Sequence, residues 1–450
     1  MIYRPFYEHV VYPLYHWAMK DGANQALREL TANESLDVEG LRRVTERKLA
    51  NLLVHAARNV PYYREAFKDA GITAADAADP SCLGAIPLLS KPLINRHLDD
   101  LVATDLTGNG LDPNSTGGST GEVLRFYTDW HSGAYRKATV LRNKRWLGIN
   151  PGDREIRLWG APLDFAKSKS FRSRLHAVIT GERLLSADHL DDQRLESYLR
   201  TCKSFRPKLL VAYPSALRHF AEFCESRSAT LPSLQAIICS AESLFDHDRE
   251  VIERALGTRV FNRYGCREVG DIAHEARGVE GLLINSDRVR VEILDEAGRE
   301  CEPGTQGEVV VTDLDNLGMP LIRYRIGDYA TRAPTFVEKE SRYPFPALAS
   351  VDGRTLDVVR TTTGHRVGGT YWTLLLRSRP GFSRFQVIQT APDLVRIHYL
   401  PEPGTTPEFD YFRREIAATC GDALRVEFVE VSELRHEPGT KYRLVISELP

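Results

Sequence analysis

The pattern of apolar and polar residues predicts alternating helices and strands along most of the chain. Segment 45–60 places apolar side chains on one face at helical spacing: Leu49, Leu52, Leu53 and Ala56. Pro61 follows this segment directly. The spacing therefore predicts an amphipathic surface helix that ends just before the proline.

The middle of the chain alternates helical segments with short β-rich ones. A helical segment at 192–205 leads into the apolar run 209–213, and helical spacing returns over 214–224. Two further β-rich runs follow at 236–239 and 259–265. This alternation is typical of a largely parallel sheet whose faces are covered by helices.

After residue 280 the pattern changes to antiparallel β-structure. Alternate positions from Val289 to Leu294 are apolar, the residues 296–298 (Glu-Ala-Gly) predict a turn, and the run 307–314 predicts the next strand.

Beyond Gly353 the pattern predicts a small unit of its own. Two strands, at 384–389 and 394–400, precede a helix at 407–421 and a strand at 425–431. The helix carries its apolar side chains on one face: Phe409, Phe412, Ile416 and Cys420. A β-β-α-β unit of this length forms an independent α+β domain.

The predicted fold class is therefore α/β, with two domains. Residues 1–352 form a large N-terminal domain with helix-covered, largely parallel sheets and an antiparallel β region. Residues 353–450 form a small, mobile C-terminal α+β domain. A chain of 450 residues exceeds what one hydrophobic core usually holds, which agrees with more than one domain.

Composition excludes several classes of function. The formal net charge is -2 and no basic block is present, so nucleic acid is not an expected partner. The seven scattered cysteines do not form a disulfide pattern, which predicts a reducing, cytoplasmic compartment. No apolar run is long enough to span a bilayer, so we expect a soluble protein. The aromatic N-terminal segment 3–17 fits either packing against the domain or contact with a membrane surface.

A polar, glycine-rich stretch, STGGSTG at 115–121, is the first candidate for chemistry. Glycines let a backbone approach an anion, and hydroxyl groups donate further hydrogen bonds, so the stretch could hold phosphate. It is neither a Walker A motif, since no lysine follows Gly121, nor a dinucleotide fingerprint, since segment 122–128 (EVLRFYT) has the pattern of a strand. Taken alone, the stretch could equally be a linker or a turn.

Five other stretches accompany the loop in a fixed order. They are CSAESL (239–244), RYGCREVG (263–270), PLIRYRIGD (320–328), DGRTLDVV (352–359) and PGTKYRLVI (438–446). In this order and spacing the set resembles the adenylate-forming acyl ligases, over nearly the whole chain. The resemblance is greatest to the phenylacetate-coenzyme A ligase branch, which includes relatives associated with polysaccharide biosynthesis.

The resemblance implies roles for these residues. The loop would wrap the β- and γ-phosphates of ATP with Ser115, Thr116, Gly117, Gly118, Ser119, Thr120 and Gly121. Tyr264, followed by Gly265, would stack on adenine, and Glu268 would reach a magnesium ion. The main chain at Ala241 and Glu242 would lie beside the adenine, while the Glu242 side chain has either a binding or a structural role.

The C-terminal motifs complete the implied site. Asp328 would hold both ribose hydroxyls. Arg354 would contact the ribose or a phosphate, and Asp357 would be the hinge between the domains. Lys441 would bind the substrate carboxylate and the α-phosphate as charge develops during adenylation.

The sequence departs from the family pattern at several positions. Arg267 stands where most members have threonine, and Glu122 stands where a lysine commonly follows the loop. Some relatives carry a zinc site after the adenine motif. Here Cys266 and His274 remain without the further ligands that a structural zinc needs, so zinc is not an expected cofactor.

The sequence says least about the identity of the substrate. Trp159, Pro162 and Tyr213 would form the apolar, partly aromatic wall of an acyl pocket near Ser240, which favours an aryl or aryl-acetic acid. The same aromatic residues could equally be part of the hydrophobic core. The resemblance implies ATP, Mg²⁺ and coenzyme A, with small-molecule partners and a possible homodimer. Two alternatives remain open: transfer of the acyl group to an amine in polysaccharide or natural-product biosynthesis, and a catalytically inactive nucleotide-binding protein.

Overall fold

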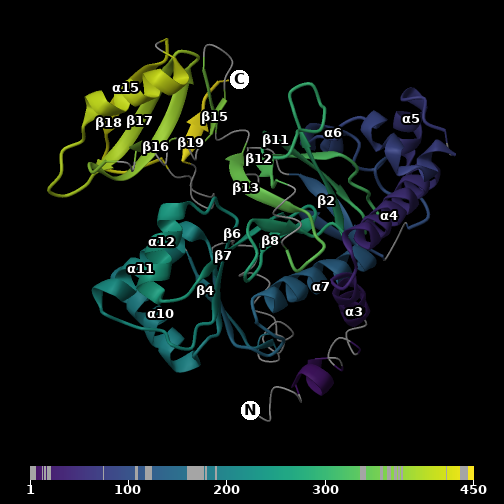
Figure 1. Ribbon diagram of the computed structural model, residues 1–450, viewed down its shortest axis with the longest axis horizontal. Helices are drawn as coiled ribbons and strands as arrows, with labels where there is room; N and C mark the ends of the chain where they lie inside the picture. The colour runs from purple at the N-terminus through teal and green to yellow at the C-terminus, as the bar shows by residue number, and fades with distance from the viewer. Residues whose placement is uncertain are drawn as a thin grey trace. The chain divides into compact units, whose positions relative to one another are not determined.

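A computed structural model describes most of the chain (Figure 1). The described residues are 7–12, 14, 17, 22–73, 75–106, 110–116, 124–159, 177, 180–187, 190–334, 341–354, 358–361, 366–368, 372, 375–376, 379–421, 423–435 and 444–449. The chain divides into two compact units. The first is Met1–Thr305, Val309–Ile326 and Thr331–Ser350, and the second is Gln306–Glu308, Gly327–Ala330 and Val351–Pro450.

The first unit begins with helices that pack on its β-structure. They are η1 (Tyr7–Val11), α3 (Ala23–Asn33), α4 (Val38–Asn59), α5 (Pro61–Asp69), η2 (Asp76–Ala78), η3 (Pro80–Ala85) and α6 (Lys91–Arg96). Helix α4 starts where the Asp37 side chain accepts a hydrogen bond from the Gly40 amide, at 2.7 Å. It ends before Pro61, and the four apolar residues that predicted it are buried.

An 11-stranded sheet forms the centre of the described fold, in the order β10-β11-β12-β13-β9-β8-β7-β6-β5-β3-β4. The strands are β3 (Glu155–Trp159), β4 (Glu182–Ser186), β5 (Leu209–Ala212), β6 (Ala236–Ser240), β7 (Val260–Cys266), β8 (Gly270–Glu275), β9 (Leu282–Ile284), β10 (Val289–Leu294), β11 (Gln306–Asp313), β12 (Tyr324–Arg332) and β13 (Ala347–Arg354). From β4 to β7 the pairing is parallel, and from β7 to β9 it is antiparallel. The parallel and antiparallel regions predicted from the sequence therefore join in one sheet.

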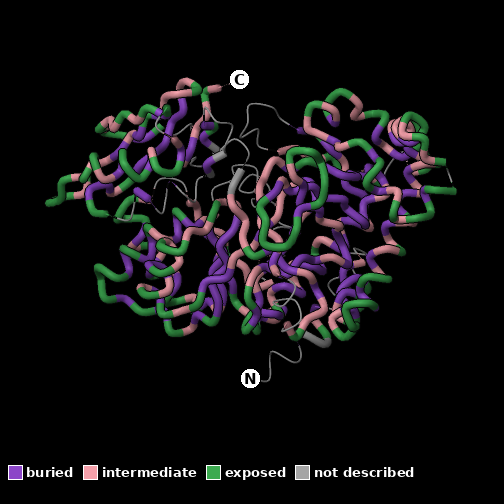
Figure 2. The backbone as a smooth tube through the Cα atoms, turned by 45° about the horizontal axis from the view of Figure 1, so that its top comes forward, coloured by how far each residue is buried: buried purple, intermediate pink, exposed green. Residues whose placement is uncertain are grey.

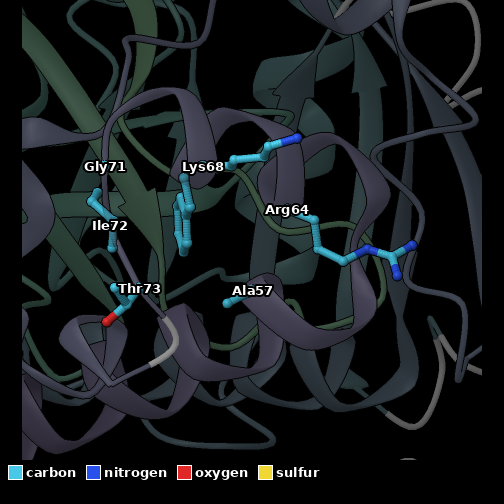
Figure 3. Close-up of a pocket in the computed structure, with 7 residues that line it drawn as sticks. Ala57, Arg64, Lys68, Gly71, Ile72 and Thr73 are labelled. Carbon is cyan, nitrogen blue, oxygen red and sulfur yellow. The ribbon is translucent and has the colours of Figure 1, made fainter.

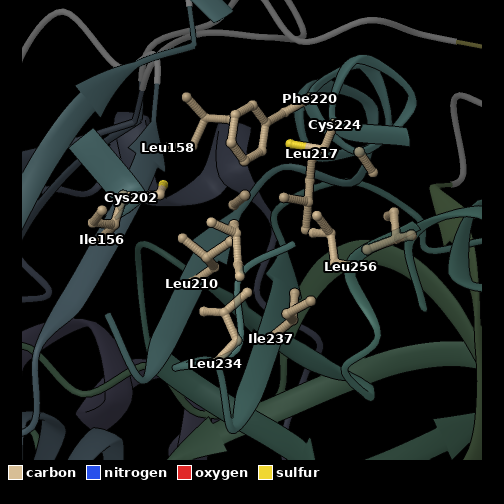
Figure 4. Packing of buried hydrophobic residues seen from close by; sticks show 14 of the residues in the cluster. Ile156, Leu158, Cys202, Leu210, Leu217, Phe220, Cys224, Leu234, Ile237 and Leu256 are labelled. Atoms are coloured by element: carbon tan, nitrogen blue, oxygen red, sulfur yellow. The ribbon is translucent and has the colours of Figure 1, made fainter. Parts of the chain in front are cut away.

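Three helices cover one face of the parallel strands: α10 (Asp192–Phe205), α11 (Pro214–Ser226) and α12 (Asp246–Leu256). Figure 4 shows the resulting core, in which side chains of β3, β5 and β6 meet those of the helices. Leu217, Phe220 and Cys224 of α11 all lie in this core, as their spacing predicts. Figure 2 shows buried stretches of the backbone in the interior and exposed ones mostly at the periphery.

Helix α7 (Trp130–Trp146) packs beside the sheet and follows a β-hairpin of β1 (Leu111–Ser115) and β2 (Arg125–Asp129). Asp129 joins the two elements. Its Oδ1 accepts from the Ser132 amide at 2.7 Å and caps α7, while its Oδ2 accepts from the Gly318 amide at 2.8 Å. The hairpin and the helix are thus fixed to the chain that follows β11.

The second unit contains a four-stranded sheet in the order β18-β17-β16-β19. Its elements are β14 (Val358–Arg360), β15 (Arg366–Gly368), β16 (Phe382–Ala391), β17 (Leu394–Pro401), α15 (Phe409–Cys420), β18 (Arg425–Glu430) and β19 (Val445–Ser447). Helix α15 buries Phe412, Ile416 and Cys420 in the core of this unit, and Phe409 packs against it. In addition to the predicted β-β-α-β elements, β19 pairs parallel to β16.

Within the described ranges, no helix combines the length and the hydrophobicity needed to cross a bilayer.

Candidate active site

The turn that carries Glu268, residues 267–269, connects β7 to β8. Two guanidinium groups hold its main chain, that of Arg136 partly buried and that of Arg288 fully buried. Arg136 donates to the carbonyl oxygens of Arg267, at 3.0 Å, and of Glu268. Arg288 donates to the carbonyl oxygen of Val269 at 2.6 Å. The position of this turn is therefore fixed by side chains from α7 and from the residue before β10.

Asp313 joins the two arginines. Its Oδ2 lies 3.5 Å from Arg136 and its Oδ1 lies 3.2 Å from Arg288. Burial lowers the pKa of Arg136, while the charge of Asp313 acts in the opposite direction. Asp313 and Arg288 are fully buried and Arg136 is partly buried, so removal of Asp313 or Arg288 would leave an uncompensated charge beside the turn.

The Glu268 side chain is itself buried, with 4 % of its surface exposed. Its Oε1 accepts a hydrogen bond of 2.9 Å from the hydroxyl group of Tyr324, which begins β12. A buried, oriented carboxylate fits a magnesium ion, because Mg²⁺ is commonly bound by one or two carboxylates together with substrate phosphates. Among the described residues, no group of three or more Asp, Glu, His or Cys side chains could hold a metal ion by itself.

The predicted adenine residues lie at the ends of β6 and β7. Ala241 has a φ of 72°, in the left-handed region that residues other than glycine rarely adopt. Such strain often accompanies a functional backbone position. Tyr264 is buried, and a side chain on Gly265 would meet the backbone of Gly270 on β8, so the tight pairing of the two strands requires glycine there.

Glu242 has a structural contact. Its Oε2 accepts a hydrogen bond of 3.1 Å from the Ser215 amide, in the first turn of α11. This contact supports the structural alternative for its side chain.

The phosphate-loop motif begins at the end of the β1–β2 hairpin. Ser115 pairs with Arg125 in the ladder. The Thr116 amide donates to Leu124 O at 3.0 Å, and the Leu124 amide donates to Thr116 Oγ1 at 3.1 Å. Gly117, Gly118, Ser119, Thr120 and Gly121 lie outside the described residues. The described ends of the motif thus form a hairpin and not the strand-to-helix junction of a Walker A loop.

The remaining predicted residues belong to the second unit. Asp328 lies in the stretch Gly327–Ala330 of β12, and Arg354 is the last residue of β13. The Arg354 side chain, Asp357 and Lys441 lie outside the described residues. Their roles stay predictions.

Two residues of the predicted acyl pocket are in contact. The rings of Trp159 and Tyr213 lie 4.3 Å apart. Arg263 lies beside them, with its guanidinium carbon 6.0 Å from the centre of the Trp159 ring and its Nε donating to Ser240 Oγ at 3.1 Å. Pro162 lies outside the described residues.

The sequence did not single out Arg136, Arg288 or Tyr324, which position Glu268. Tyr324 stands inside the quoted stretch 320–328, so its motif offered a signal. Nothing in the local sequence distinguishes Arg136 from other helical arginines, because its partners lie more than 130 positions away.

A hollow beside the N-terminal helices is a separate feature (Figure 3). It measures about 340 Å³ and is lined by Ala57, Arg64, Phe67, Lys68, Gly71, Ile72 and Thr73. None of the predicted site residues borders it.

Comparisons with known proteins give the similarity of the chain as a whole. Residues 131–314 match the family described as AMP-binding enzyme. A phenylacetate-coenzyme A ligase of Pseudomonas putida is 27% identical over 368 residues, which cover 76% of each chain. Protein CapK of Staphylococcus aureus is 26% identical over 274 residues, covering 60% of this chain and 58% of CapK.

Solved structures show the same fold. A 2-hydroxyisobutyryl-CoA ligase in its postadenylation state superposes with a TM-score of 0.73 at 17% identity, over 92% of this chain and 91% of that one. ATP-bound MatB from Rhodopseudomonas palustris superposes with a TM-score of 0.55 at 14% identity, over 74% and 66% of the two chains. The predicted fold class is confirmed by this similarity.

Proposed function

We propose that the chain is an adenylate-forming ligase of the branch that resembles the phenylacetate-coenzyme A ligases, and that it activates a carboxylic acid with ATP and transfers the acyl group to coenzyme A. An aryl or aryl-acetic acid is the favoured substrate. The observation that carries the proposal is the turn 267–269, whose main chain is held by Arg136 and Arg288 while Tyr324 orients the Glu268 carboxylate.

The first half-reaction requires positioning more than covalent chemistry by the protein. A carboxylate oxygen of the substrate attacks the α-phosphorus of ATP in line. The bond between this phosphorus and the bridging oxygen breaks, pyrophosphate leaves and an acyl-adenylate remains. In this proposal the loop 115–121 binds the outer phosphates through amides and hydroxyls, Tyr264 and the main chain at Ala241 bind adenine, and Asp328 binds the ribose.

Magnesium would be held by Glu268, and when bound it neutralises charge on the phosphates. Tyr324 orients the carboxylate through its hydroxyl group. Lys441 would neutralise the charge that develops on the substrate carboxylate and the α-phosphate.

The second half-reaction is attack by the coenzyme A thiolate on the acyl carbon. The new carbon–sulfur bond forms as the bond from the acyl carbon to the adenylate oxygen breaks, and AMP leaves. The proposed rotation about Asp357 would withdraw Lys441 between the two half-reactions.

Product analysis tests this function. The enzyme is incubated with ATP, magnesium and a panel of acids, with and without coenzyme A, and the products are identified by mass spectrometry. We expect acyl-AMP without coenzyme A, and acyl-CoA with AMP in its presence. Amide formation with a supplied amine, and none of the thioester, would instead favour an amine acceptor.

A matched pair of variants separates the binding role of Glu268 from general damage. Glu268→Gln removes the proposed magnesium ligand, and Glu242→Gln changes a carboxylate that contacts the first turn of α11. We expect Glu268→Gln to lower acyl-AMP formation by about 10²-fold or more, and Glu242→Gln to retain most of it. Equal losses in both variants would contradict the role of Glu268.

A further inference from the structure

A second, polar cavity lies between α7 and the sheet strands β3 to β8. It measures about 60 Å³, enough for a few water molecules or a small polar group. Six charged side chains line it: Lys144, Arg157 and Arg263 against Glu155, Glu182 and Asp271. The lining is therefore polar but balanced in charge, unlike the apolar pocket that the sequence predicts.

The cations of this cavity have carboxylate partners. Lys144 bonds to Glu155 Oε2, Arg157 Nε lies 3.7 Å from Glu155 Oε1, and Arg263 Nε lies 3.8 Å from Asp271 Oδ1. Asp271 also accepts a hydrogen bond from Asn143 of α7, at 3.3 Å. These ion pairs neutralise most of the charge inside the cavity without a ligand.

His274 differs from the other lining residues. It is 1 % exposed, and its Nδ1 lies 2.6 Å from the carbonyl oxygen of Glu275. A carbonyl only accepts, so Nδ1 carries the hydrogen. Burial lowers the pKa of His274 to about 4, which keeps the ring neutral.

The other ring nitrogen, Nε2, is therefore a hydrogen-bond acceptor. Within the part of the chain that the structure describes, it has no hydrogen-bond partner, and neither has Glu155 Oε1. Of these two acceptors, Glu155 Oε1 has the Arg157 guanidinium 3.7 Å away. His274 Nε2 is therefore the acceptor that requires a donor, because an unsatisfied buried polar atom is costly.

Arg263 connects this cavity to the predicted acyl pocket. It lines the cavity and also lies over the Trp159 ring, which packs against Tyr213. Arg263 thus borders both the polar cavity and the aromatic pair of the predicted acyl pocket.

We propose that this cavity binds an uncharged hydrogen-bond donor, in the first instance a hydroxyl group, on the end of the substrate remote from its carboxylate, and that His274 Nε2 accepts the hydrogen bond. The inference rests on the proposed function and names its substrate class as hydroxylated carboxylic acids. A carboxylate could not donate to either acceptor. An ammonium group would add an unbalanced charge beside Lys144 and Arg263.

The test compares acids that differ by one group. Phenylacetate is paired with 3- and 4-hydroxyphenylacetate, and hexanoate with 6-hydroxyhexanoate. Aminomethyl and carboxymethyl derivatives of phenylacetate supply the charged cases. Acid-dependent pyrophosphate release gives kcat/KM for each acid. We expect the hydroxylated member of at least one pair to be preferred by roughly 10- to 100-fold, and the charged acids to be poor substrates.

Variants at His274 test the acceptor. His274→Leu should abolish the preference, lowering kcat/KM for the hydroxylated acid by roughly 10- to 100-fold and that for its parent acid by less than about threefold. His274→Gln keeps an acceptor and should retain part of the preference if the leucine variant does not fold. His55→Leu is the matched control, since His55 lies on α4 and bonds to Leu317 O at 3.0 Å. It should leave the preference unchanged.

The outcomes separate the inference from the function on which it rests. Release with unsubstituted or charged acids at equal or higher kcat/KM overturns the inference and leaves the proposed function standing. Equal losses for both members of a pair in His274→Leu also overturn it, because a cavity that holds only structural water would respond in this way. Absence of release with every acid would overturn the proposed function and, with it, this inference.

Discussion

His274 gives a quantitative prediction about stability. In the unfolded chain its pKa is close to 6.5, and in the folded protein burial lowers the pKa to about 4. Arg263 and Lys144 also favour the neutral ring, while the Glu275 carbonyl and Asp271 favour the charged one. As the pH falls through this window, the unfolded chain binds a proton that the folded protein does not, so stability must fall with it.

The size of the effect follows from the shift. Each pKa unit corresponds to about 1.4 kcal/mol, so the difference between 6.5 and about 4 is worth about 3 kcal/mol once both states are titrated. Most of this free energy of unfolding is already lost when the pH has fallen to 4.5. Between pH 7 and pH 5 the free energy of unfolding falls by about 2 kcal/mol.

Denaturant unfolding of the wild type and of His274→Leu, followed by tryptophan fluorescence at several pH values, measures this effect. Groups other than His274 titrate in both proteins, so the difference between the two stability curves isolates the histidine. We expect this difference to shift by about 2 kcal/mol in favour of the variant from pH 7 to pH 5. Parallel curves would refute the buried, neutral state of His274.

Three further predictions follow from other sites. Arg142 and Asp287 form a fully buried ion pair at 2.6 Å, so Arg142→Leu should destabilise the protein by about 3 to 5 kcal/mol in chemical unfolding, and a loss below about 1 kcal/mol would contradict this role. Gly265→Ala should lower stability by about 1 to 3 kcal/mol, because the new methyl group would press on the Gly270 carbonyl, and an unchanged midpoint would show that the strands give way. Lys441→Ala should lower adenylation by roughly 10²-fold while sparing thioester formation from supplied acyl-adenylate, and equal losses in both steps would contradict its proposed role.

Elements with strong periodicity were predictable from the sequence. The buried faces of α4 and α15 consist of the apolar residues that predicted them, because burial of one face stabilises a helix more than its intrinsic propensity does. The strands β5, β6 and β7 were likewise predicted, since each is a short apolar run between helical segments.

The pairing of the strands into one sheet was harder to predict from the sequence. The sequence predicted parallel and antiparallel regions, but not that they share one sheet, because pairing between distant strands depends on contacts that no local pattern encodes. Alternation in β10 was also an incomplete guide. Glu292 is buried there and pairs with Arg323 at 3.1 Å, whereas alternation places it opposite to the apolar face.

In the candidate site, too, some residues were predictable from the sequence and others were not. Motif residues such as Tyr264 and Glu268 were found by resemblance, whereas Arg136 and the polar cavity around His274 emerge only when α7 packs against the sheet. A buried histidine is a common structural feature. The fold alone places His274 in this polar cavity, with an Nε2 that has no hydrogen-bond partner among the described residues.

Acid-dependent exchange of labelled pyrophosphate into ATP tests the central claim most directly, because it reports formation of an acyl-adenylate without requiring the acceptor. We predict exchange that depends on both magnesium and a carboxylic acid, and that falls by about 10²-fold or more in Glu268→Gln. Exchange that is absent with every acid, or that is unchanged in Glu268→Gln, would contradict the account.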